Sequence, residues 1–133
     1  MPMSAYLQNL VLQATLQGES FTLPSSVYLG LHTTDPTIET ATALSTEISG
    51  NGYSRVAITF TDPNGSYITE NVATVTFSPA TPLGHGTIYY ISLWDAISTG
   101  NLLYYGALSS PVAIASGESF SMVSGGLQIK YTT

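Results

Sequence analysis

The chain has 133 residues, about the length of a single domain with one hydrophobic core. Two basic residues stand against eight acidic ones, and the net charge of −6 argues against nucleic acid and anionic lipid as partners. No cysteine is present, which excludes disulfides, thiolate metal ligands and cysteine nucleophiles. We therefore expect one domain over residues 1–133, without a nucleic-acid or membrane partner.

Residues 1–18 carry the one convincing helical pattern, in which apolar side chains recur at three- and four-residue spacing. Gly18 is a natural stop, because glycine readily adopts the left-handed conformation at a helix C-terminus. Leu12 and Leu16 widen the apolar surface beyond one stripe. This amphipathic helix is expected either to pack on a sheet or to bind a neighbouring subunit. Its interface candidates are Leu7, Leu10 and Val11.

From residue 22 onward the apolar period changes to two, and clusters of Pro, Gly, Asn and Asp interrupt it often. This pattern is typical of many short strands. We predict a mainly β fold, a two-layer antiparallel β-sandwich over residues 19–133 with the one N-terminal helix. The predicted strands cover residues 27–32, 53–61, 73–78, 87–94, 102–108, 112–115, 119–123 and 126–131.

Each predicted strand should turn one face inward, because successive side chains point to opposite sides of a sheet. In the first strand, one face carries Val27, Leu29 and Leu31. The opposite face carries Tyr28, Gly30 and His32. The alternation therefore separates an aliphatic face from a mixed one.

Residues 33–49 form a long, Thr-rich and weakly periodic segment between two predicted strands. Long segments of this kind in compact domains are usually functional or disordered. We predict an extended arm, or a loop that crosses between sheets, which orders against a partner subunit. Its apolar interface candidates are Ile38 and Leu44.

The Gly-rich stretch at residues 49–52, "SGNG", raises the question of a phosphate-binding loop. It matches neither the Walker A pattern nor Gly-x-Gly-x-x-Gly, and a strand pattern rather than a helix follows it. We therefore predict a tight turn that leads into the strand at Tyr53.

Candidate catalytic and metal-binding residues are few. His32 and His85 are the only histidines, and neither has further ligands at metal-site spacing. No Gly-x-Ser-x-Gly motif is present, although a triad assembled in space is not excluded by sequence order. The carboxylates lie in turns or in the arm and indicate no catalytic pair. We predict no enzymatic activity, no catalytic residue, no cofactor and no metal site.

Aromatic residues and one arginine complete the candidates. Nine tyrosines and one tryptophan suit either a sugar-binding surface or sheet and subunit contacts. The aromatic interface candidates are Tyr89, Trp94 and Tyr104. Arg55 is expected to form an ion pair at the surface or in an interface, which is worth little free energy if it is exposed.

Three segments together resemble a family of small virion structural proteins of tailed bacteriophages. They are "YLGLHTTDP" at 28–36, "EISGNGYSRVAITF" at 47–60 and "IYYISLWDAISTGNLLYYGALSSPVAIASGESFSM" at 88–122. The chain departs from the family pattern at Thr37 and at "TEIS" before the glycines. The resemblance implies a virion component, made in the host cytoplasm, and carries over no catalytic residue.

Two functions follow from this resemblance. The first is a capsid decoration, or cement, protein that forms small symmetric homo-oligomers and stabilises the shell. Its helix and arm would then bind the major capsid protein or other virion proteins. The alternative is a tail-associated fibre or adhesin component whose tyrosine and tryptophan rings contact a host glycan receptor. An unrecognised hydrolase ranks third.

Overall fold

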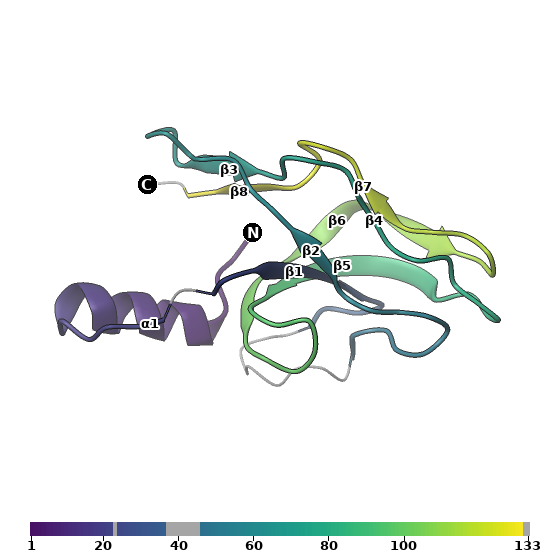
Figure 1. The fold of residues 1–133 in the computed structure, drawn as a ribbon, viewed down its shortest axis with the longest axis horizontal. Coiled ribbons are helices and arrows are strands. Elements are labelled where there is room, and N and C mark those ends of the chain that lie inside the picture. Colours follow the sequence, from purple (N-terminus) through teal and green to yellow (C-terminus); the bar gives the residue numbers. More distant parts are fainter. Residues whose placement is uncertain (23, 37–45, 132–133) are drawn as a thin grey trace.

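The structure is a computed structural model that describes residues 1–22, 24–36 and 46–131. Within these ranges the chain forms one helix and eight strands (Figure 1). In chain order they are α1 (Ala5–Leu16), β1 (Val27–His32), β2 (Val56–Ile58), β3 (Ile68–Glu70), β4 (Val75–Thr76), β5 (Gly86–Trp94), β6 (Leu102–Ile114), β7 (Ser121–Met122) and β8 (Gln128–Lys130).

The strands form two layers. One layer is a four-stranded antiparallel sheet in the order β2-β1-β5-β6. The other consists of two antiparallel ribbons, β3 with β8 and β4 with β7, which lie above the sheet in Figure 1. This is the mainly β, antiparallel fold with one N-terminal helix that the sequence predicts, and its layers have the arrangement of a sandwich.

The hydrophobic core lies between the layers. Alternation along β1 turns Leu29 and Leu31 into it, whereas Gly30 and His32 lie on the opposite face of the sheet. The predicted alternation in this strand is confirmed. Other core side chains come from both layers and include Ile58, Val75, Phe77, Ile91, Leu93, Phe120, Met122, Leu127 and Ile129.

β3 and β6 differ most from the predicted strands, and β2, β4, β7 and β8 are shorter than predicted. The sequence does not predict β3, because Ile68–Glu70 is short and mostly polar and finds its partner, β8, only at the far end of the chain. β6 is one long strand where the sequence predicts two, at 102–108 and 112–115. Pro111 fits because β6 is an edge strand, where a missing backbone donor is tolerated.

Helix α1 is attached to the sheet by the residues that precede it. The Ser4 hydroxyl accepts a bond from the amide of Leu7 at 3.1 Å, which caps the helix, and donates to the Leu102 carbonyl at 2.5 Å. The Ser4 amide also bonds the Leu103 carbonyl at 2.8 Å. At the other end, Gly18 adopts a φ of 70° and ends the helix as predicted.

Beyond this attachment, α1 extends away from the sheets (Figure 1). None of its 12 residues is buried. Leu12 and Leu16, near its end, are 54% and 77% exposed. Leu7 and Leu10 are half-buried, whereas the part of the predicted apolar surface that Leu12 and Leu16 form is therefore left uncovered by the rest of the described chain. No helix in the described ranges has both the length and the apolar character to span a membrane.

Because these two leucines contribute little to the fold, we expect Leu12→Gln/Leu16→Gln to change the free energy of unfolding by less than about 0.5 kcal/mol per site. Glutamine keeps a similar helix propensity. The measurement is urea unfolding followed by the fluorescence of Trp94, the single tryptophan. The matched control is Leu29→Ala, which should cost about 2–5 kcal/mol because Leu29 is fully buried. A comparable loss in the helix variant would show that α1 belongs to the core.

Candidate functional site

A buried ion pair lies on the face of the sheet opposite the core. The Glu47 carboxylate receives two bonds from the Arg55 guanidinium, from Nε at 2.8 Å and from Nη2 at 2.7 Å. The two side chains are only 4% and 9% exposed for Arg55 and Glu47, respectively. This bidentate geometry is the strong form of the arginine–carboxylate pair. The prediction of an ion pair for Arg55 is thus correct, but its expected place at the surface is wrong.

Arg55 makes three further contacts within the chain. Its Nη1 donates to the carbonyls of Ala96 at 2.9 Å and Thr99 at 2.7 Å, in the loop between β5 and β6. Its guanidinium carbon lies 3.8 Å from the centre of the Trp94 ring, a cation–π distance. Trp94 is itself fully buried, so neither side chain offers an exposed surface to a receptor or subunit.

Hydroxyl groups extend this arrangement across the sheet. The Tyr53 hydroxyl donates to Glu47 at 2.6 Å. The Trp94 indole donates to the Ser92 hydroxyl at 2.6 Å. The same hydroxyl also bonds His32 Nε2 at 2.7 Å. We call these side chains the buried polar network: His32, Glu47, Tyr53, Arg55, Ser92 and Trp94.

The network needs a glycine at its centre. A Cβ on Gly30 would lie 2.7 Å from the Ser92 hydroxyl, 3.0 Å from the Trp94 indole nitrogen and 3.1 Å from a Glu47 carboxylate oxygen. Any side chain on Gly30 would therefore displace the network. The glycine in "YLGLH" lets the three groups lie close above the strand.

The turn at residues 49–52 supplies the connection between the two charged residues. Gly50, Asn51 and Gly52 all have positive φ, and the Tyr53 amide bonds the Gly50 carbonyl at 3.0 Å. It is a tight turn, as predicted. The sequence pattern does not show directly that this turn brings Glu47 and Arg55 together. The signal was present, because a lone arginine on a strand whose other face is aliphatic needs an acidic partner if it is covered.

The polar groups of the network have their hydrogen bonds satisfied. Burial lowers the pKa of His32 from 6.5 to about 4, although Glu47 opposes the shift, so the ring is neutral at neutral pH. Burial, followed by the charge of Glu47, raises the pKa of the Tyr53 phenol. Among the described residues, every buried side-chain nitrogen and oxygen has a hydrogen-bond partner. No group of three His, Asp or Glu side chains there could hold a metal ion. The network thus has the character of a scaffold.

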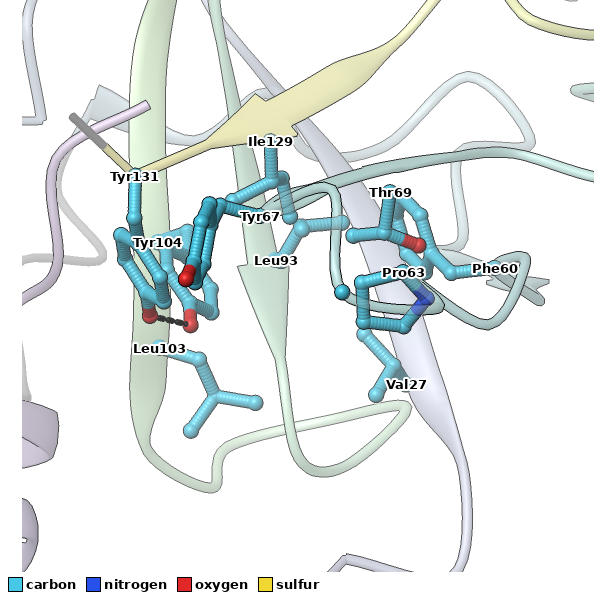
Figure 2. Close-up of a pocket in the computed structure, with 11 residues that line it drawn as sticks. Val27, Phe60, Pro63, Tyr67, Thr69, Leu93, Leu103, Tyr104, Ile129 and Tyr131 are labelled. Carbon is cyan, nitrogen blue, oxygen red and sulfur yellow. Dashed lines mark hydrogen bonds between the residues drawn. The ribbon is translucent and has the colours of Figure 1, made fainter.

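A second feature, an apolar pocket, lies on the other face of the sheet (Figure 2). Its volume is about 370 Å³. It opens between the β3–β8 ribbon and the strands β1, β5 and β6. In Figure 2, tyrosine rings form one side, Phe60 and Pro63 the other, and Val27 lies below. None of the described residues that line it is charged.

The tyrosines around this pocket are held in place. Tyr104 and Tyr131 share a hydrogen bond between their hydroxyls, and burial raises the pKa of Tyr104. Tyr67 has a φ of 62°, a rare conformation for an aromatic residue, and its carbonyl accepts the Tyr131 amide at 3.0 Å. Its ring is 70% exposed at the pocket mouth. Backbone strain of this kind collects at functional sites.

The structure separates the predicted interface candidates. Tyr104 lines the pocket, and Tyr89 is exposed on β5. Leu7 and Leu10 are half-buried in α1, and Val11 is exposed. Arg55 and Trp94 are in the interior. The two arm candidates, Ile38 and Leu44, lie outside the described residues.

A comparison with protein families assigns the chain to a family. Residues 2–130 match the model of the family described as Podophage GP4 fiber I protein gp80. The chain belongs to this family. The predicted kinship with virion structural proteins of tailed phages is confirmed at that level, and the gp80 match favours the fibre alternative over capsid decoration. No curated protein matches the chain.

For this member of the gp80 family, Arg55→Met should lower the free energy of unfolding by about 3–5 kcal/mol, because it leaves the Glu47 charge buried and unpaired. Urea unfolding monitored at Trp94 measures the loss. Lys130→Met, which removes the other basic residue at an exposed position, is the matched control and should have an effect below about 0.5 kcal/mol. Adding Glu47→Gln to Arg55→Met should restore part of the loss. If Arg55→Met and Lys130→Met lowered the free energy of unfolding equally, the stabilising role of the Glu47–Arg55 ion pair would be contradicted.

His32 should make stability depend on pH. Its folded pKa of about 4 lies below the unfolded 6.5, so between these values the unfolded chain binds a proton that the folded chain does not. The contribution of neutral His32 to the free energy of unfolding is complete above pH 6.5. It is lost as the pH falls to 4, and the free energy of unfolding decreases by up to about 3 kcal/mol. Urea unfolding across this range measures the slope of stability against pH. His32→Gln should reduce this slope more than His85→Gln, because burial lowers the pKa of both rings but only His32 is fully buried. The same slope in both variants would refute the assignment to His32.

Proposed function

We propose that the chain is a non-enzymatic structural component of a podophage fibre, held to neighbouring virion proteins through α1. The family match over residues 2–130 is the observation that carries this proposal. The family is described as a fibre protein of podophages, and a virion is the expected location. The capsid decoration function drawn from the sequence has no comparable support.

The chemistry of the interior supports a structural role. The residues that could catalyse a reaction, His32, Glu47 and Arg55, bond one another or their neighbours in the buried polar network. Each of the three is at least nine-tenths buried. A general base or nucleophile has to reach substrate with a free lone pair. The network instead fixes the loops on one face of the sheet and gives a rigid body for assembly.

The chemistry of α1 supports a role in attachment. The helix has neither an acidic residue in its first turn nor a basic one in its last, and its sequence "AYLQNLVLQATL" is uncharged throughout. An exposed helix with leucines and no charge is typical of one that is covered in an assembly. Burial of a leucine side chain is worth about 1.5–3 kcal/mol. Two such side chains provide a useful part of a subunit contact.

If α1 attaches the protein, phage that encode Leu12→Gln/Leu16→Gln should carry at least about tenfold fewer copies per particle, because two apolar contacts are lost. Quantitative mass spectrometry of purified particles measures the copy number. The matched control is Val123→Gln, an equally exposed apolar residue at 62% that lies outside α1. Wild-type copy number in the helix variant would contradict attachment through α1.

The same particles distinguish the fibre from the shell. Antibody against the chain, visualised with gold in electron micrographs, should mark the tail end of wild-type particles. Label spread over the capsid, together with hundreds of copies per particle, would instead restore the decoration function. Unlabelled helix-variant particles would show that the antibody reports the bound protein.

A further inference from the structure

The apolar pocket and the projecting helix are two complementary surfaces on one chain. The pocket holds about 370 Å³, and the lining residues that the structure describes are all uncharged. Pockets of a few hundred cubic ångströms with an apolar lining are suited to binding apolar groups. The helix presents Leu12 and Leu16, which are separated by four residues and therefore lie one above the other on the same face.

The helix of a given copy points away from the pocket of that copy. Residues 2–4 hold the start of α1 on the edge of β6, through the bonds of Ser4 and the bond from the Tyr105 amide to the Pro2 carbonyl at 3.2 Å. From there the helix runs outward, so its last turn is the part farthest from the sheets (Figure 1). Any contact between these leucines and the pocket has to join two chains.

The lack of charge on both surfaces is compatible with a second copy as the occupant. Each chain carries a net charge of −6, so two copies repel unless they meet through uncharged surfaces. The helix carries no charged side chain, and none of the described pocket residues is charged, so these two surfaces can meet without bringing acidic side chains of either surface together. A charged peptide would find no opposite charge in the pocket. We propose that Leu12 and Leu16 of one copy occupy the apolar pocket of the next.

The pocket is preformed for such a contact. The bond between the hydroxyls of Tyr104 and Tyr131 braces one wall, and the Tyr131 amide holds the Tyr67 carbonyl. Tyr67 keeps its ring exposed at the mouth at the expense of a strained backbone. Figure 2 shows the three rings grouped on the same side, where they would flank an entering side chain. Tyrosine is enriched in subunit interfaces because it is large and amphipathic.

The contact joins two different surfaces and is therefore heterologous, or head-to-tail. Such contacts close into a ring when the rotation between copies permits and otherwise extend as a filament. Each copy uses its helix once and its pocket once, so every internal copy has both features covered. This inference deepens the proposed attachment through α1 by naming the partner, and it rests on that proposal.

Disulfide trapping tests the contact, because the cysteine-free chain gives no background. One full-length variant carries Leu16→Cys on α1, and a second, enlarged by a tag, carries Val27→Cys in the pocket. Mixed under a mild oxidant, they should form a disulfide-linked heterodimer, resolved by size on a non-reducing gel. The matched acceptor is Val123→Cys, which is 62% exposed and outside the pocket. Linkage to Val27→Cys should be about tenfold faster, since a disulfide needs close Cα atoms.

The outcomes separate this inference from the attachment it rests on. Adding Leu12→Gln to the Leu16→Cys chain should slow linkage to Val27→Cys and leave linkage to Val123→Cys unchanged. Equal rates for the two acceptors, or no linkage to Val27→Cys, would overturn the pocket as the binding site. If the helix variant still failed to enter particles in that case, α1 would bind a different virion protein and only this inference would fail.

Discussion

Glu47 and Arg55 place a carboxylate and a guanidinium side by side in the interior of a chain that has only two basic residues. Either charge alone would be costly to keep away from water, and the pair is stable there because its hydrogen bonds are satisfied. Arg55 also binds the carbonyls of Ala96 and Thr99. One side chain therefore ties together the segment before the turn, the start of β2 and the loop between β5 and β6.

The two faces of the four-stranded sheet have consequently different roles. On one face, the buried polar network fixes loops that would otherwise have few apolar contacts. On the other face, aliphatic side chains form the core and leave the apolar pocket beside the β3–β8 ribbon. Gly30 shows how closely the two are coupled, because it lies on β1 between the core residues Leu29 and Leu31 and gives the network its space.

Local patterns in the sequence predict much of this fold. β1 has the predicted bounds, β5 begins one residue earlier than expected, and Gly18 ends the helix. These features depend on periodicity and on glycine conformation, which neighbouring residues determine. β3 depends instead on pairing with a segment near the other end of the chain, which a local pattern does not contain.

The candidate sites were predicted less well, for a related reason. The sequence marks Arg55 and Trp94 as unusual but does not say which of eight acids joins the arginine, or that its guanidinium covers the indole. Both were therefore expected at a surface. The pocket is still harder to foresee, because Val27, Leu93 and Ile129 are ordinary core residues in sequence and only the packing of the layers leaves space between them.

Stability and the proposed attachment involve different residues in this molecule. The ion pair and the core hold the body, whereas α1 adds exposed leucines and no buried side chain. Since the apolar helix and the apolar pocket carry no charge, contacts made through them are screened little by salt, unlike those of exposed ion pairs. If the proposed contacts form, the chain is joined to its neighbours through apolar surfaces, while its buried ion pair lies within the chain and takes no part in them.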